Sequence, residues 1–253
     1  MTTATATYVE RPLWRPAHTF LVGLIFVAIS VIGISLPQSG GQLGFLGQRT
    51  VLAWIAIAAL MTAFAAIAGH GVTGLWRGVL VDDRHRVSLS RLQMLLWTVL
   101  VLSAYLAAAL ANIGRDSAAP LEVSIPSELW LAMGISTASL VAAPAALAHR
   151  QRRRGVVAAA RPHARESRFA DLFHGEDAAD QDKLDLGKVQ MFLFTVVLVL
   201  GYGLALGDMF EEKQSAFTSL PSVDEAVVTL LAISHAGYLT RKVVSTTATE
   251  DKP

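Results

Sequence analysis

Residues 92–113 read LQMLLWTVLVLSAYLAAALANI, a run of 22 residues without Asp, Glu, Lys or Arg. A helix rises about 1.5 Å per residue, so a run of this length can cross a hydrocarbon core about 30 Å thick. A helix on a soluble protein would carry charge on its outer face, and this run carries none. Five further runs share this character: 19–36, 51–69, 129–148, 189–207 and 226–240. The sequence therefore predicts an all-α, polytopic membrane bundle of six transmembrane helices.

The composition agrees with this prediction. Apolar residues make up 53% and charged residues 16% of the 253 residues, against about 45–50% and about 25% in soluble domains. There is no cysteine, which excludes disulfides, thiolate metal sites and cysteine nucleophiles. The sequence has no glycine-rich phosphate loop, zinc-binding helix motif or nucleophile elbow. We therefore expect a protein that is not an enzyme and that carries no cofactor or metal.

The basic residues set the expected orientation. With the N-terminus in the cytoplasm, 18 of the 21 Lys and Arg residues fall in cytoplasmic segments, and only Arg49, Arg115 and Lys213 fall outside. Basic residues favour the cytoplasmic side, so we expect an inner-membrane protein with both termini in the cytoplasm. The first run is too long for a signal peptide and lacks a small-residue cleavage site, so a retained helix is expected.

These runs divide the chain into seven expected segments. They are a cytoplasmic tail (1–18), a first transmembrane hairpin (19–69), a cytoplasmic or interfacial connector (70–91), a second hairpin (92–148), a long cytoplasmic loop (149–188), a third hairpin (189–240) and a cytoplasmic tail (241–253).

The second and third hairpins resemble each other. Two sets of residues match at a constant offset of 97: Gln93, Met94, Thr98 and Tyr105 match Gln190, Met191, Thr195 and Tyr202. In the helix that follows, Ser136 matches Ser234 at an offset of 98. Matched polar residues at fixed spacing indicate a duplication. Since both hairpins enter from the cytoplasm, the sequence predicts a parallel repeat with a pseudo-twofold axis along the membrane normal.

Met94, Thr98 and Tyr105 lie on one stripe of their helix, because their spacing follows the helical period. Met191, Thr195 and Tyr202 form the counterpart stripe. Hydroxyl groups prefer protein partners to lipid, so both stripes are expected to face protein. Small residues beside the stripes, such as Ala104 and Gly201, would let the third and fifth helices approach closely. Packing between these helices is the favoured interpretation, and a polar pathway lined by Gln, Thr and Tyr is the alternative.

The membrane runs also contain amide and imidazole side chains. Gln93 and Gln190 are expected to form hydrogen bonds between helices. His235 is the only residue of the six runs that titrates near neutral pH, and a packed or interfacial neutral imidazole is expected. Its equivalent in the first copy is Thr137, so a duplicated proton relay is not expected.

The long loop changes from basic to acidic along its length. Its basic half carries seven arginines: Arg150, Arg152, Arg153, Arg154, Arg161, Arg165 and Arg168. Such a loop is expected to be largely disordered. Its arginines would fix the topology or contact anionic lipid or a cytosolic partner. His174 is a single histidine among scattered acidic residues, which does not indicate a metal site. The arginines are explained by their role in topology, so no nucleic-acid partner is expected.

Two classes of function remain. The first is a membrane anchor or assembly subunit, packed as a bundle and associated with itself or with another protein. The second is an oligomeric channel or transporter. Ion-coupled transport normally needs carboxylates at membrane depth, and the six runs contain none. A non-catalytic anchor or assembly subunit is therefore the favoured function.

Overall fold

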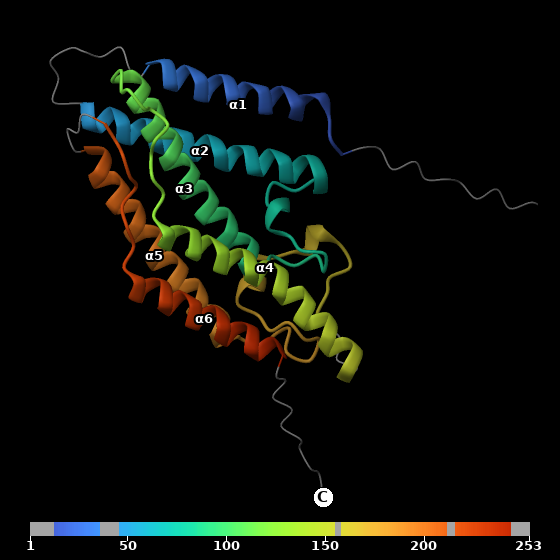
Figure 1. Ribbon diagram of the computed structural model, residues 1–253. Helices are drawn as coiled ribbons and strands as arrows, with labels where there is room; N and C mark the ends of the chain where they lie inside the picture. Colours follow the sequence, from blue (N-terminus) through green and yellow to red (C-terminus); the bar gives the residue numbers. More distant parts are fainter. Residues whose placement is uncertain (1–12, 36–45, 155–157, 212–215, 244–253) are drawn as a thin grey trace, which may run out of the picture.

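The computed structural model describes residues 13–35, 46–154, 158–211 and 216–243. Within these residues the chain forms six α-helices: α1 (Pro16–Ser35), α2 (Leu46–Thr73), α3 (Leu89–Gly114), α4 (Ser127–Arg154), α5 (Leu186–Glu211) and α6 (Glu225–Val243). Short 3₁₀ helices occur in the connections: η1 (Gly78–Leu80), η2 (Ala164–Glu166) and η3 (Phe169–Leu172). The predicted all-α class is confirmed (Figure 1).

Five helices, α1 to α5, are long and apolar enough to cross a membrane, which indicates an integral membrane protein. The shorter α6, with 19 residues, is not among them. The largest difference from the expected boundaries is in α4, which continues beyond residue 148 to Arg154. The basic segment after residue 148 thus begins as helix, because arginine is a good helix former.

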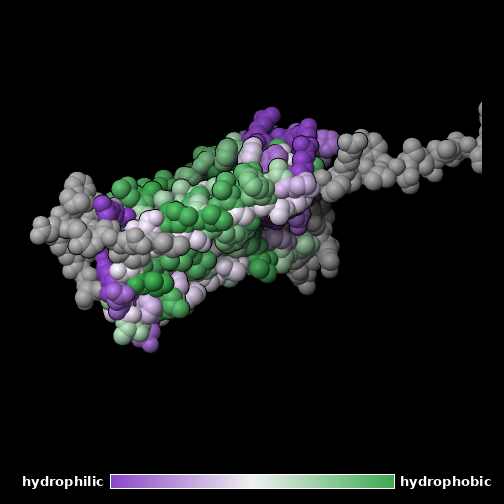
Figure 2. All heavy atoms as spheres, turned by 90° about the horizontal axis from the view of Figure 1, so that it is seen from above, coloured by the Kyte–Doolittle hydropathy of each residue, from purple (hydrophilic) through white to green (hydrophobic). Residues whose placement is uncertain are grey.

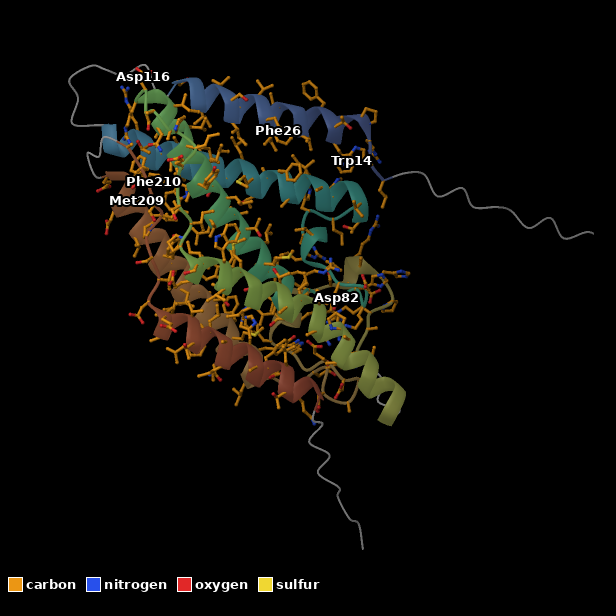
Figure 3. The ribbon with its side chains drawn as sticks, viewed as in Figure 1. Trp14, Phe26, Asp82, Asp116, Met209 and Phe210 are labelled. Atoms are coloured by element: carbon orange, nitrogen blue, oxygen red, sulfur yellow. The ribbon has the colours of Figure 1, made fainter. Side chains whose placement is uncertain are left out.

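The surface has the character of a membrane protein. Figure 2 shows apolar side chains gathered in a broad band along the helices, with hydrophilic residues concentrated toward the two ends. Large apolar side chains such as Phe20, Leu52 and Leu204 point outward and are more than half exposed. Exposed apolar area on this scale would be costly in water and is expected where lipid covers the protein. Asp82 and Asp116 lie at opposite ends of the bundle (Figure 3).

The central helix is α3, which packs against α1, α2, α4 and α5. Its buried face carries small residues, including the fully buried Ala104 and Ala108. Small side chains let neighbouring backbones approach closely. The matching expectation for Gly201 is wrong: this residue is exposed, and a Cβ atom there would meet no atom within 4 Å.

Helices α3 and α5, the first helix of each expected repeat hairpin, begin in a similar way. Ser88 Oγ accepts a hydrogen bond from the Arg91 backbone N–H at 3.4 Å, and caps α3. Asp185 Oδ1 accepts bonds from Gly187 N–H and Lys188 N–H at 2.9 and 3.3 Å, at the start of α5. Each residue supplies an oxygen to an otherwise unpaired N–H, which is the usual role of Ser or Asp at a helix N-terminus.

The far ends of the two hairpins are joined to each other. Ser124 and Ser219 form a parallel bridge, with backbone hydrogen bonds of 2.8 and 2.9 Å. The buried Asn112 side chain accepts from Phe217 N–H at 2.7 Å and donates to Phe217 O at 2.8 Å. These contacts fix the connection before α6 to the end of α3. The two hairpins are therefore held together at this end by hydrogen bonds as well as by apolar packing.

Candidate functional site

A buried polar cluster lies where α3, α4, α5 and α6 meet. It consists of Gln93, Ser139, Thr195 and His235, one residue from each helix, all at most 2% exposed. Gln93 Nε2 donates to Thr195 Oγ1 at 2.6 Å and lies 3.4 Å from His235 Nε2. His235 Nδ1 bonds to Ser139 Oγ on the other side of the ring. The cluster therefore links all four helices through neutral side chains.

One arrangement of protons that accounts for these contacts begins at Thr195. The Thr195 hydroxyl donates to Met191 O at 2.8 Å, which leaves its oxygen to accept from Gln93. The two N–H groups of the Gln93 amide then serve Thr195 and the Nε2 lone pair of His235. In this tautomer of His235, Nδ1–H donates to Ser139 Oγ. Gln93 Oε1 remains buried without a hydrogen-bond partner among the described residues.

The other matched residues lie in surroundings different from those of the polar cluster. Gln190 is exposed on the outside of the bundle, while its counterpart Gln93 is fully buried. The Tyr105 and Tyr202 hydroxyls donate to the carbonyls of Leu121 and Pro221, at 3.2 and 3.0 Å. Each tyrosine thus bonds to the connection that follows its own helix.

The remaining matched residues do not join the polar cluster. Met191 is fully buried in an apolar group that includes Leu80 and Leu172. Met94 and Thr98 are half-buried. Ser136 is buried and donates to the carbonyl of Ala132 in its own helix, and Ser234 is also buried. Among the matched repeat residues and His235, the structure therefore brings only Gln93, Thr195 and His235 together.

A second polar assembly lies at one end of the bundle. We call it the polar cap and define it as residues 77–88 together with residues 158–188. Its centre is Asp171, a residue only 1% exposed. Asp171 Oδ1 pairs with Arg161 Nη2 at 2.6 Å, and Oδ2 accepts from the N–H groups of Arg168 and Val87 at 2.8 and 3.4 Å. The long loop and the connector are thereby tied to one carboxylate.

Further buried charges attach the polar cap to the helices. Arg86 donates to Gly175 O at 2.7 Å and lies 3.8 Å from the Asp171 carboxylate. Glu176 accepts from Lys188 at the start of α5, at 3.1 Å, and from the Tyr238 hydroxyl of α6, at 2.9 Å. Lys188 and Arg86 are each only 4% exposed. Since a buried charge without a partner is costly, each of these contacts favours the folded cap.

The electrostatics of the cap are consistent with paired charges. Burial by itself would raise the pKa of Asp171, but the hydrogen bonds from Arg161 and from the Arg168 backbone lower it below the ordinary value of 3.8. Burial lowers the pKa of Arg86, and the neighbouring Asp171 opposes this change. Both groups are therefore charged at neutral pH, and each neutralises the other.

The expectation that the long loop is largely disordered is wrong for its described residues, 158–188. Charge compensation explains the difference: the acidic half of the loop folds back on its basic half and on the connector, and Leu172 is buried beneath them. Net charge predicts disorder only when the charges repel. Here Asp171 lies between Arg161 of the same loop and Arg86 of the connector. Glu176 lies beside Arg84 and Lys188.

The predicted contact arginines have three different environments. Arg161 is bound to Asp171. Arg165 and Arg168 are exposed, and so is the adjacent Phe169. The backbones of the other four lie in the last turns of α4, where the structure does not describe their side chains: Arg150, Arg152, Arg153 and Arg154.

Several residues of these sites were missed by sequence reasoning. Asp171, Arg86 and Ser139 carry no motif, and Val87 and Asp171 are 84 residues apart in the chain. A weak signal existed for Asp171, because it belongs to the short turn Phe169–Leu172 that interrupts the charged loop. Among the described residues, no group of three or more His, Cys, Asp or Glu side chains could hold a metal ion.

No protein-family model, curated protein or solved structure matches this chain.

Proposed function

We propose that the chain is a non-catalytic, multi-pass membrane anchor or assembly subunit whose polar cap contacts the cytoplasmic surroundings. The observation that carries this proposal is the attachment of the cap to the helices by Lys188 and Tyr238 through Glu176. A loop that only set the topology would need positive charge but no buried ion pairs. A buried ion-pair network adds little net stability, because the desolvation of the charges offsets their attraction. One reason to retain such a network is that it fixes the conformation of the surface above it.

The exposed tip of this cap is the contact surface that we propose. It consists of Arg165, Arg168 and Phe169, which are all exposed. Two cations beside an aromatic ring suit an anionic lipid surface, where each basic residue gains about 1 kcal/mol. We expect the tip to contact anionic phospholipid, while contact with an acidic protein would be a different outcome of the test below.

The orientation and the sixth span belong to the same proposal. The bias of 18 basic residues among 21 favours a cytoplasmic cap. We also propose that α6 crosses the membrane beside α4, with which it shares its most extensive packing.

The duplication of the hairpins is proposed on three supports. Ser88 and Asp185, the capping residues of α3 and α5, stand 97 residues apart, which is the offset of the sequence match. Tyr105 and Tyr202 make equivalent hydrogen bonds to the connections that follow. The corresponding helices also pack in pairs, α3 with α5 and α4 with α6. Together these features favour two copies related by an axis along the bundle.

An oligomeric channel is the alternative. Within one chain the polar cluster is closed, because Gln93, Thr195 and His235 are at most 2% exposed. A pathway through these residues would therefore require the helices to separate. In planar bilayers the anchor proposal expects no conductance from the purified protein. Conductance that changes when a cysteine replacing Thr98 is modified would instead favour the channel.

The orientation can be tested by labelling single cysteines, since the natural chain has none. In intact cells, a cysteine at Ser117 should react with an impermeant reagent, and one at Gln181 should not. Both positions lie on described segments, Ser117 after the end of α3 and Gln181 before the start of α5. External labelling at Gln181 would contradict the cytoplasmic cap.

The tip contact can be tested in nanodiscs with a polarity-sensitive dye on a cysteine replacing Ala170, an exposed residue. The dye should report a less polar environment in discs with anionic lipid than in zwitterionic discs, and added salt should reverse the change. Joint replacement of Arg165 and Arg168 by Gln should abolish the difference. Lys183→Gln, an exposed cation elsewhere in the cap, is the matched control. A response indifferent to lipid charge would refute lipid contact and favour a protein partner.

A further inference from the structure

A pocket of about 540 Å³ opens between the polar cap, the start of α3 and the second half of α4. Figure 3 labels Asp82, which lines the pocket, at this end of the bundle. The volume lies within the usual range for small-molecule sites. One wall is apolar and includes Met94 of α3 with Leu140 and Pro144 of α4. The opposite wall is polar, so the pocket suits an amphipathic ligand.

Two buried donors of the polar wall have no acceptor. Ser90 lines the pocket and is only 2% exposed, and its Oγ has no hydrogen-bond partner among the described residues. Arg84 also lines the pocket, and its Nη1 is likewise buried without a hydrogen-bond partner. Buried donors normally find acceptors, because leaving one unpaired costs free energy. Both donors therefore call for a ligand that carries acceptor oxygens.

The charges of the pocket add a further requirement. Arg91 and Asp83 form a long ion pair of 3.7 Å, and the Asp83 side chain is fully exposed. Exposed pairs of this kind are weak, so either partner can be exchanged. Asp82, in contrast, is held by the Arg84 side chain and by the N–H groups of Arg84 and Arg86. The pocket thus offers one exchangeable cation beside one exchangeable anion.

The first turn of α3 lies against the same space. Ser88 and Ser90 both line the pocket, and Ser88 is the N-cap of the helix. The start of a helix carries partial positive charge and favours a bound anion. The orphan hydroxyl of Ser90, the Arg91 guanidinium and the helix dipole all favour negative charge at one place.

We propose that this pocket binds the headgroup of an aminophospholipid of the phosphatidylethanolamine type. The phosphodiester oxygens accept hydrogen bonds from Ser90, Arg84 and Arg91, and the ammonium group replaces Arg91 as the partner of Asp83. The first methylene groups of the lipid lie along Met94, Leu140 and Pro144, on the wall that continues into the apolar surface of α4. The exchange leaves the net charge of the pocket unchanged, which favours a zwitterion over a purely anionic lipid.

The test uses the purified full-length protein, delipidated in detergent and titrated with phosphatidylethanolamine, phosphatidylglycerol and glycerophosphoethanolamine. Bound lipid is counted by native mass spectrometry. Phosphatidylethanolamine should bind best. Ser90→Ala should weaken its binding about fivefold through loss of one hydrogen bond, and Arg91→Gln about tenfold through loss of a charged one. Asp83→Asn should remove the preference for phosphatidylethanolamine over phosphatidylglycerol.

Two controls keep the result interpretable. Lys183→Gln removes an exposed cation that belongs to neither the pocket nor the tip, and it should leave lipid counts unchanged. Contact of the tip is measured separately by the dye at position 170, so failure of tip docking and failure of the pocket site are separate results. Ser90→Ala removes only an unpaired hydroxyl, so this variant should unfold at the same temperature as the parent. Equal binding by the parent, Ser90→Ala and Arg91→Gln would overturn the site. Glycerophosphoethanolamine that binds as tightly as the lipid would overturn the lipid assignment.

Discussion

The polar cluster between the helices and the polar cap are both buried, yet they are built from different chemistry. The cluster holds an amide, two hydroxyls and an imidazole, each at most 2% exposed. The cap holds full charges, centred on Asp171 and Glu176. Charges are far more costly to bury than neutral groups, so they occur where opposite charges can be supplied by neighbouring segments. The comparison indicates that folding of the loop depends on the pairing of opposite charges. Packing of α3 to α6, in contrast, needs only a few hydrogen bonds between uncharged side chains.

The largest expected effect is the loss of the central carboxylate of the cap. Asp171→Asn leaves Arg161 and Arg86 without their anion, and removal of one partner of a buried pair is expected to cost about 3 kcal/mol. Hydrogen exchange of residues 158–185 should accelerate, while exchange within α3 and α5 should change little. Asp180→Asn, at an exposed position of the same cap, is the control and should cost less than about 0.5 kcal/mol. Equal effects of both substitutions would remove the distinction between the cap and a solvated loop.

The same carboxylate makes the cap sensitive to acid. The pKa of Asp171 is lowered in the folded protein. A group with a lowered pKa stabilises the fold above its unfolded value of about 4, and this contribution is lost as the pH falls through the folded pKa. Protection of the cap against hydrogen exchange should thus be steady between about pH 5 and pH 7 and decline in stronger acid. Asp171→Asn should remove the part of this decline that arises from Asp171. A decline that is unchanged in that variant would assign the sensitivity to other groups.

Apolar packing can be tested with a matched pair of substitutions in the bundle. Ala104→Leu inserts a large side chain at a fully buried position of α3 and should cost about 1–3 kcal/mol through overpacking. Gly201→Leu adds the same side chain to an exposed position of α5, where a Cβ atom meets nothing within 4 Å, and should have little effect. Thermal unfolding in detergent measures both. Similar losses in the two variants would show that α5 packs more closely than the structure describes.

The same comparison shows which parts of the structure can be predicted from the sequence. The helices and their approximate limits can be predicted from the uncharged runs, because a long apolar segment without charged residues is favoured in the hydrocarbon core of the membrane. Gln93 and His235 were recognised as polar groups at membrane depth, but their partners were not. Ser139 was missed, since a serine in an apolar helix has no signal of its own. Gly201 was misplaced because sequence similarity to the first hairpin does not say which face of α5 meets lipid.

The loop was misjudged for a different physical reason. Each half of the loop is strongly charged by composition. The contacts that bury Asp171 join the loop to distant residues, among them Val87, whose N–H group lies 84 positions earlier in the chain. No local pattern reports such a pairing. Ser88 and Asp185, in contrast, were predictable as helix N-caps, because capping is a property of a few adjacent residues.

The smallest expected effect concerns the neutral cluster. Thr195→Val keeps the shape of the side chain and removes the oxygen that accepts from Gln93 at 2.6 Å. Hydrogen bonds between membrane helices contribute about 0.6 kcal/mol on average, so this variant should remain folded with a loss of that size. A double-mutant cycle with Gln93→Leu isolates the pair, and Thr137→Val, whose exposed hydroxyl bonds within its own helix, is the matched control. A coupling energy near that of the control would mean that apolar packing alone holds α3 to α5. A coupling above about 2 kcal/mol would exceed the range for such bonds and make the cluster as important to its helices as the ion pairs are to the cap.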